Sequence, residues 1–128
     1  MLKVGIDICS IDRIRAVYGK YGSRFLSKIL TAAESDYVLS RKKHAIETLA
    51  GRFAAKEAVA KVLGVGWRGL SFKEIEIGRH PSGAPHVILY GRALILANRL
   101  NLRHFEVSLS HEKQFAVASV IGYSEQDR

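Results

Sequence analysis

The chain has 128 residues, of which 48% are hydrophobic and 25% are charged, and its formal net charge is +8. This length predicts one domain over residues 1–128, or a subunit that shares its core with copies of itself. No apolar run approaches the roughly 18 residues of a membrane span. The first apolar run is too short for a secretory signal, because Asp7 interrupts it. One cysteine, Cys9, cannot form an internal disulfide, which favours a reducing, cytoplasmic location.

The positive charge is concentrated in the N-terminal half of the chain. Residues 1–64 carry twelve Lys and Arg against six Asp and Glu, which gives +6, whereas residues 65–128 carry eight against six. A basic half favours a polyanionic partner, which leaves open a nucleic acid, an acidic protein or a phosphate-rich small molecule.

Apolar periodicity predicts an α+β fold with a mostly antiparallel sheet packed on one long and several short helices. Strands are expected over residues 2–8, 72–77, 86–90, 105–110 and 115–121, the last two as a terminal hairpin. Helices are expected from about 12 to 19, and over 23–30, 31–40, 45–63 and 92–100. Ser10 or Asp12 is the expected cap of the first helix, and Gly19 and Gly22 are expected to end it.

Two carboxylates lie far apart in sequence, each within an otherwise apolar element. Asp7 points to the strand face opposite the aliphatic residues, and Glu57 lies at the border of the apolar stripe of the long helix. Asp7 is either a solvated edge charge or a ligand, and Glu57 either pairs with Lys61 at i,i+4 or binds a metal. A hard cation such as Mg²⁺ takes one or two protein carboxylates and completes its shell with water and phosphate.

Basic residues follow the same long helix towards two glycines. Arg52, Lys56 and Lys61 form either a solvated face or a set of phosphate contacts that leads into Gly64 and Gly66. The order of residues excludes a Walker loop, because the glycines follow the helix. Near the C-terminus, Ser110 and His111 lack the Gly-x-Ser-x-Gly elbow of a serine hydrolase. Their alternative to hydrolase chemistry is a contact with phosphate or nucleoside.

These motifs resemble the holo-acyl-carrier-protein synthase family, the small bacterial 4'-phosphopantetheinyl transferases. The family's N-terminal pattern is Gly-x-Asp-aliphatic, followed by Arg-Ile. Residues 5–8 are similar to its first part and residues 13–14 to its second. Its Arg-Phe-Ala-x-Lys-Glu-Ala, followed by Lys and Gly-x-Gly, is similar to residues 52–58, Lys61 and residues 64–66. Gly83, Pro85 and the run 108–111 also fall where the family has them. Two positions depart from the family, because many members carry Glu in place of Ser10 and Thr in place of Val65.

The resemblance implies that the phosphopantetheine arm of coenzyme A is moved to a serine of apo acyl carrier protein, with release of adenosine 3',5'-bisphosphate. It implies that Asp7 and Glu57 hold Mg²⁺ against the pyrophosphate and that Lys61 bridges the phosphates. It also implies that Glu57 takes the serine proton, either directly or through a metal-bound water. Coenzyme A is then a co-substrate. Its further contacts are expected from Arg52, Lys56, Gly64, Gly66, Gly83, Pro85, Ser110 and His111.

The resemblance also implies partners. The family is typically a homotrimer with sites between subunits, and Arg13, Arg15, Lys20 and Arg24 would meet the acidic carrier protein. One alternative is a small basic nucleic-acid-binding domain, but its aromatic residues would be interleaved with Lys and Arg, whereas those here follow apolar patterns. A non-catalytic adaptor for acidic proteins leaves Asp7 and Glu57 unexplained. Neither a nucleic acid nor a membrane is therefore an expected partner.

Overall fold

The computed structural model describes residues 1–125, and its elements follow the predicted order. The strands are β1 (Leu2–Ser10), β2 (Ile75–Arg79), β3 (Pro85–Leu89), β4 (His104–His111) and β5 (Phe115–Tyr123). The helices are α1 (Ile11–Tyr21), α2 (Ser23–Ile29), α3 (Ala32–Ser40), α4 (Ala45–Leu63) and α5 (Gly91–Arg99), with short 3₁₀ helices η1 (Lys42–His44) and η2 (Phe72–Glu74). The expected α+β class is confirmed.

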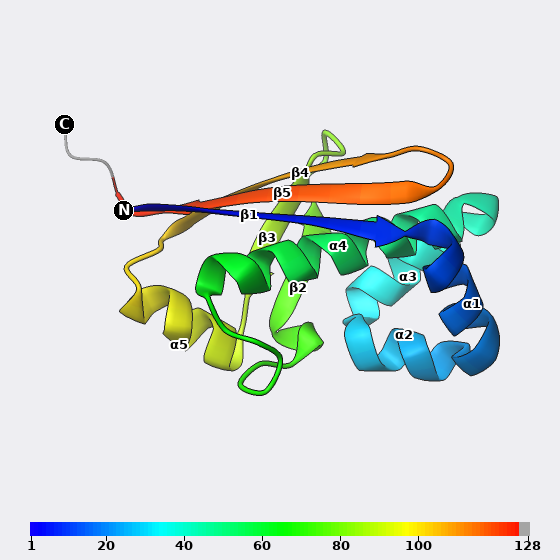
Figure 1. The fold of residues 1–128 in the computed structure, drawn as a ribbon, viewed down its shortest axis with the longest axis horizontal. Coiled ribbons are helices and arrows are strands. Elements are labelled where there is room, and N and C mark those ends of the chain that lie inside the picture. Colours follow the sequence, from blue (N-terminus) through cyan, green and yellow to red (C-terminus); the bar gives the residue numbers. More distant parts are fainter. Residues whose placement is uncertain (126–128) are drawn as a thin grey trace.

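The strands form two antiparallel sheets rather than one. One has the order β1-β5-β4, and the other pairs β2 with β3. In Figure 1, α4 runs along one face of the three-stranded sheet, α1, α2 and α3 gather at one end of the molecule, and α5 lies at the other end. Helix α4 contacts strands of both sheets and therefore holds a central position. No helix within residues 1–125 is long and apolar enough to cross a bilayer.

Five predicted boundaries are wrong by two or three residues. Strands β1, β2 and β5 each end two residues later than expected, and the other two differences have local causes. The strand expected from Phe72 begins only at Ile75, because Ser71 and Glu74 form a capping box that turns the intervening residues into η2. Helix α1 continues through Gly19 and ends before Gly22. Gly22 has a φ of 57°, which glycine adopts at little energetic cost. Ser10 is the N-cap of this helix, since its hydroxyl oxygen accepts from the Arg13 N–H at 3.2 Å.

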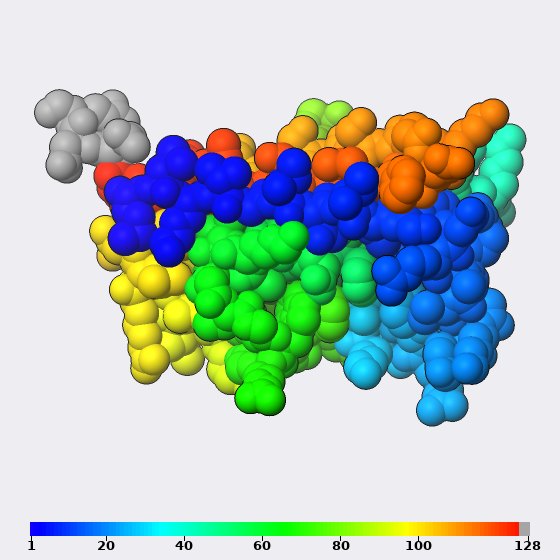
Figure 2. Space-filling view, in the orientation of Figure 1, coloured from blue at the N-terminus to red at the C-terminus, as the bar shows by residue number. Residues whose placement is uncertain are grey.

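Strand β1 turns its aliphatic face outward. Leu2, Val4, Ile6 and Ile8 are each 60–62% exposed, and Figure 2 shows the β1 side chains as a continuous strip above α4. The opposite face, which carries Asp7, packs on α4 through small residues. Gly5 makes this possible, because a Cβ there would collide with the carbonyl oxygen of Ala58. The alternation in the sequence therefore identifies the strand but not its buried face.

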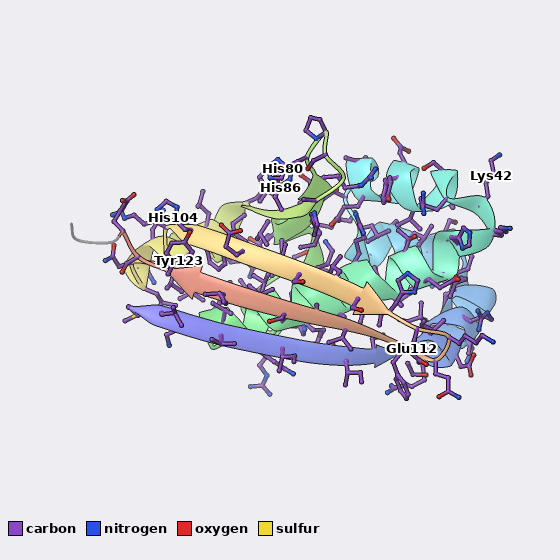
Figure 3. The ribbon with its side chains drawn as sticks, turned by 90° about the horizontal axis from the view of Figure 1, so that it is seen from above. Lys42, His80, His86, His104, Glu112 and Tyr123 are labelled. Atoms are coloured by element: carbon purple, nitrogen blue, oxygen red, sulfur yellow. The ribbon has the colours of Figure 1, made fainter. Side chains whose placement is uncertain are left out.

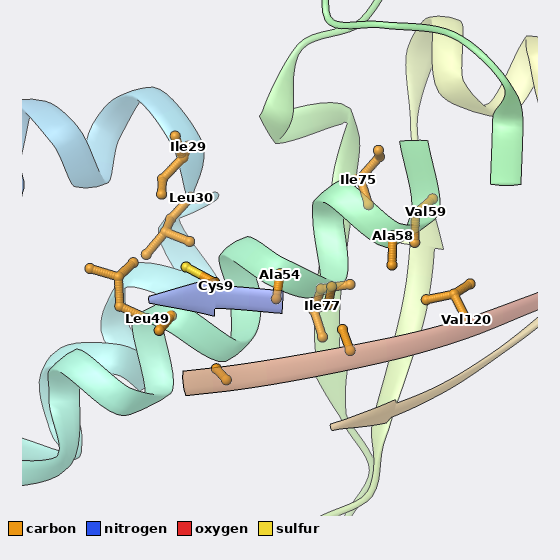
Figure 4. Close-up of a cluster of buried hydrophobic side chains, with 14 of the residues drawn as sticks. Cys9, Ile29, Leu30, Leu49, Ala54, Ala58, Val59, Ile75, Ile77 and Val120 are labelled. Atoms are coloured by element: carbon orange, nitrogen blue, oxygen red, sulfur yellow. The ribbon is translucent and has the colours of Figure 1, made fainter. Parts of the chain in front are cut away.

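The core lies around α4. Seen from above, the three strands cover this helix (Figure 3), and a buried cluster joins its alanines to both sheets (Figure 4). Ala54 and Ala58 are fully buried between Cys9 of β1 and Ile75 and Ile77 of β2. Because small side chains let the sheet approach closely, α4 and β1 are held at a short, fixed separation. This packing brings Asp7 to the helix that carries Glu57 and Lys61.

Candidate active site

Asp7 and Glu57 line the same cavity, which has a volume of about 380 Å³ and lies among β1, α1, α2 and α4. Its other lining residues are Ile8, Cys9, Ser10, Arg13, Ile14, Val17, Phe25 and Phe53. Burial, and then the neighbouring Asp7, raise the pKa of the Cys9 thiol to about 11. The thiol is therefore protonated at neutral pH and is a poor nucleophile. Two carboxylates and Arg13 remain as the charged groups of this cavity.

Lys61 pairs with Asp7 rather than with Glu57. Its Nζ donates to Asp7 Oδ1 at 3.2 Å and to the carbonyl oxygen of Ile6 at 2.8 Å. No ion pair joins Glu57 and Lys61 in the described part of the chain, so the i,i+4 alternative is not formed. Glu57 Oε1 accepts instead from the indole N–H of Trp67, at 2.6 Å. Each carboxylate thus has one oxygen engaged by a donor, and its second oxygen makes no hydrogen bond within residues 1–125.

This donor set fits a hard divalent cation. Two carboxylate oxygens are available on the wall of one cavity, and Mg²⁺ characteristically takes one or two such ligands. Among residues 1–125, no cluster of three or more His, Cys, Asp or Glu side chains has the arrangement of a metal site. The residues therefore suit an ion that completes its shell with water and phosphate, and they do not suit the closed N/S cage of structural zinc.

Lys56 does not face a ligand, which corrects the expectation that it contacts coenzyme A. Its side chain is 0% exposed and its ammonium pairs with Glu34 at 2.7 Å. The same nitrogen donates to the carbonyl oxygens of Phe72, at 3.0 Å, and of Ile75. An ammonium group has three N–H donors, so none remains for a phosphate. Burial lowers the pKa of Lys56, and the adjacent carboxylate of Glu34 opposes that shift.

Arg52 belongs to a second cavity, of about 340 Å³, on another face of α4. Three guanidinium groups surround the Tyr37 ring, with Arg79 at 4.5 Å, Arg52 at 4.7 Å and Arg41 at 5.9 Å from its centroid. Arg52 is 7% exposed, burial lowers its pKa, and its buried Nε has no partner within residues 1–125. Buried donors without partners are uncommon, so this cluster is suited to an anion.

The sequence patterns did not identify Tyr37 and Arg79, because only folding brings α3 and β2 next to Arg52. Gly83 lies nearby, since a Cβ there would be 3.3 Å from Arg79 Nη2, and Pro85 pairs with Arg79 in the β2–β3 ladder.

The other expected coenzyme A contacts lie outside both cavities. Ser110 and His111 are exposed at the end of β4 and line neither cavity. Gly64 ends α4 with a φ of 77°, and Gly66 follows it at the surface.

The cavity with Asp7 and the cavity with Arg52 share no lining residue. Glu57 and Phe53 face the first, and Arg52 faces the second, which follows from the 100° step between successive helical residues. Within one chain, the expected phosphate and nucleotide contacts are therefore separated by α4.

The four expected partner-binding residues are all exposed on α1 and α2. Arg15 is paired with Asp12 at 2.8 Å, and the Lys20 ammonium lies 5.3 Å from the Tyr21 ring centroid.

Arg24, with Lys28, flanks a third cavity of about 610 Å³ that the sequence did not predict. Its apolar lining consists of Val17, Phe25, Ile29, Phe53 and Phe72, and three of these residues also line the cavity with Asp7. An apolar recess edged by bases thus adjoins the two carboxylates.

A family model described as the 4'-phosphopantetheinyl transferase superfamily matches residues 3–120. The chain belongs to this superfamily. It is similar to the holo-[acyl-carrier-protein] synthase of Gloeobacter violaceus, with 45% identity over 94% of this chain and 93% of the relative. Its structure resembles the crystal structure of holo-[acyl-carrier-protein] synthase from Neisseria meningitidis, with a TM-score of 0.85, 35% identity and coverage of 95% and 98%.

A second crystal structure, of the Helicobacter pylori synthase in complex with coenzyme A, gives a TM-score of 0.79, 34% identity and coverage of 94% and 99%. The predicted family, fold class and enzyme class are confirmed by these similarities. Membership of the 4'-phosphopantetheinyl transferase superfamily makes the chain an enzyme of the transferase class, in place of the binding domains considered as alternatives.

Proposed function

We propose that this chain transfers the 4'-phosphopantetheine group of coenzyme A to a serine of apo acyl carrier protein, with Mg²⁺, and releases adenosine 3',5'-bisphosphate. The observation that carries the proposal is the convergence of Asp7 and Glu57, from two elements, on one cavity, with Lys61 bonded to Asp7. The names of the relatives support the carrier protein as acceptor, and the coenzyme A complex of the Helicobacter pylori synthase supports the donor.

The chemistry is a phosphoryl-group transfer in which the chain mainly positions and neutralises charge. Asp7 and Glu57 are the residues that would hold Mg²⁺. The ion, when bound, offsets the negative charge of the pyrophosphate oxygens. The serine oxygen forms a bond to the β-phosphorus, and the bond from that phosphorus to the bridging oxygen breaks. The leaving bisphosphate takes the electron pair and Lys61 stabilises its charge. Glu57 accepts the serine proton, either directly or through a water molecule.

The nucleotide end of coenzyme A is assigned to the guanidinium cluster. Arg52 and Arg79 offer donors to the 3'-phosphate, since planar guanidinium groups bind phosphate through paired hydrogen bonds. Gly83 and Pro85 are assigned to the adenine, and Ser110 and His111 to the ribose and phosphate. Lys56 has no part in this assignment, because its donors are used inside the fold.

We propose that the active site is shared between subunits of a homotrimer. Two observations support this. The two carboxylates and the guanidinium cluster lie in different cavities of one chain, so contacts from two copies suit one coenzyme A molecule. In addition, the exposed aliphatic strip of β1 is continuous with Ile121, which stands opposite Val4 in β5. An exposed apolar strip on an edge strand is typical of a surface that another chain covers.

The carrier protein is assigned to the basic surface of α1 and α2. Arg13 lines the cavity with the two carboxylates, and Arg24 and Lys28 edge the apolar recess beside it. An acidic helix with an apolar side chain among its carboxylates would satisfy both features. Exposed charges of this kind mainly raise the association rate and its sensitivity to salt.

The test is intact-mass spectrometry of apo acyl carrier protein after incubation with this protein, coenzyme A and Mg²⁺. A parallel reaction contains EDTA, and a third contains Glu57→Gln, whose side chain keeps its size and its oxygen acceptor. The proposal predicts a gain of one phosphopantetheine mass that is absent with EDTA and largely lost with Glu57→Gln. If several folded carrier proteins gain no mass, the proposed reaction is wrong.

A further inference from the structure

Trp67 is the single tryptophan of the chain, and it donates a hydrogen bond to a residue expected to bind the cation. Its Nε1 lies 2.6 Å from Glu57 Oε1. It is the one hydrogen-bond partner of the Glu57 carboxylate within residues 1–125, because Lys61 is directed to Asp7. An indole N–H is a donor only, so its partner must be an acceptor. This contact fixes which oxygen of Glu57 is engaged and which is left for another ligand.

The indole ring is itself held in place. It stacks on Phe72 with ring centroids 3.8 Å apart and an interplanar angle of 16°, and Phe72 stacks on Phe53 at 5.6 Å. The backbone of Phe72 is fixed in turn, because its carbonyl oxygen accepts from the buried ammonium of Lys56. Phe53 lies on α4 one turn before Glu57 and lines the same cavity. The ring is therefore braced against the helix whose carboxylate it contacts.

Packing alone does not account for this arrangement. A stacked aromatic ring without a donor, such as phenylalanine, would cover Phe72 equally well and leave Glu57 free to rotate. The hydrogen bond to a charged acceptor is the stronger kind, and it restricts the carboxylate to one orientation. Partners that orient a metal ligand in this way change metal affinity although they do not touch the ion.

We propose that Trp67 is a positioning residue that orients Glu57 for the divalent cation. This inference rests on the proposed function, because it takes Glu57 as a cation ligand. Trp67 directly follows Gly66, so one residue joins the loop expected to contact phosphate to the carboxylate expected to contact the cation. The loop and the cation are then coupled through a single hydrogen bond.

The experiment measures cation binding without turnover. Mn²⁺ is the probe, because it is a hard cation with the oxygen preference of Mg²⁺ and its free form is counted by electron paramagnetic resonance. Wild-type protein should bind Mn²⁺ in competition with Mg²⁺, and Glu57→Gln should lose this binding. Trp67→Phe keeps the ring and removes the N–H, so the Kd for Mn²⁺ should rise roughly tenfold. Phe72→Leu keeps the N–H and should raise this Kd less, although it removes the stacked ring.

The outcomes separate the two proposals. If Glu57→Gln loses Mn²⁺ but Trp67→Phe binds it as wild type does, the role of Trp67 is wrong and the proposed cation site stands. If wild-type protein binds no Mn²⁺, the cation role of Glu57 fails and the inference fails with it. A second readout needs no variant of Trp67. The emission of this single indole should change when Mg²⁺ saturates wild-type protein, and constant emission under that condition would also overturn the inference.

Discussion

The Lys61 ammonium bridges α4 and β1, because it lies 3.2 Å from Asp7 Oδ1 and 2.8 Å from the carbonyl oxygen of Ile6. The lysine side chain is 55% exposed and the aspartate side chain 16% exposed. An ion pair with this much contact with water contributes only about 0–1 kcal/mol to stability. The position of Lys61, one turn after Glu57, is therefore better explained by the proposed reaction than by the stability of the fold. Activity and stability measurements separate these two contributions.

Lys61→Met should reduce kcat/KM by about 100-fold or more, since it removes a preorganised positive charge from the proposed phosphate site. The free energy of unfolding, measured with urea, should fall by less than about 1 kcal/mol. Lys73→Met is the matched control, because Lys73 is exposed and forms no ion pair within residues 1–125. Full turnover by Lys61→Met would remove this residue from the mechanism.

Lys56→Met should have the opposite effect to Lys61→Met, because it should lower the stability of the fold rather than act on coenzyme A. Removal of the ammonium leaves Glu34 charged and buried, and breaking a buried ion pair from one side costs about 3–5 kcal/mol of unfolding free energy. The double variant Glu34→Gln with Lys56→Met should recover part of this loss, because no charge then remains unpaired. A normal urea midpoint together with a raised KM for coenzyme A would return Lys56 to the phosphate-binding residues.

These two lysines show what the sequence can and cannot predict. Both follow Arg52 on one helix of good helix formers, and the pattern correctly gives the helix and its end at Gly64. Which lysine is buried depends on the position of η2 and β2 against α4, which is a property of the assembled fold. For the same reason the alternation of β1 identified Asp7 as opposite the aliphatic face, but the approach at Gly5 decided that this face packs on α4. Trp67 reaches Glu57, and Tyr37 and Arg79 reach the cavity with Arg52, only through tertiary packing, so no local pattern marked them.

Glu74 should make the protein sensitive to acid. Burial alone would raise the pKa of this carboxyl, but hydrogen bonds from the backbone N–H groups of Ser71 and Arg92, and from the Arg92 side chain, lower it below its ordinary value of 4.5. A lowered pKa in the folded state means that stability is present above pH 4.5 and is lost as the pH falls through the lower folded value. Thermal unfolding of Glu74→Gln, followed from pH 6 to pH 3, should show a smaller loss than wild-type protein. If the melting temperatures of Glu74→Gln and wild-type protein fall in parallel with pH, this role of Glu74 is wrong.

Arg24→Glu should weaken the binding of the carrier protein without affecting the binding of coenzyme A. The charge reversal places a carboxylate at the edge of the apolar recess, so KM for the carrier should rise roughly three- to tenfold at low salt and approach the wild-type value at high salt. KM for coenzyme A should stay constant. Arg99→Glu, which makes the same charge change on exposed α5, should leave both constants unchanged. An unaltered carrier KM in Arg24→Glu would exclude this docking surface.

Val4→Glu should disrupt the proposed trimer. Val4 lies at the centre of the exposed aliphatic strip, is 60% exposed in the single chain and stands opposite Ile121. Burial of an unpaired carboxylate between copies costs far more than its exposure in a monomer. Light scattering should therefore give three times the chain mass for wild-type protein and a smaller mass for the variant. Leu94→Glu on α5, a comparable change at an exposed residue outside the strip, should keep the wild-type mass.

Activity then distinguishes a shared site from a site within one chain. Because the cavity with Glu57 and the cavity with Arg52 lie on different faces of α4, a monomeric Val4→Glu protein should lose coenzyme A turnover although its circular dichroism stays native. A monomer with full turnover would mean that one chain supplies every contact, and the assignment of the nucleotide to a neighbouring subunit's Arg52 cluster would be wrong. A wild-type monomer would exclude the trimer itself.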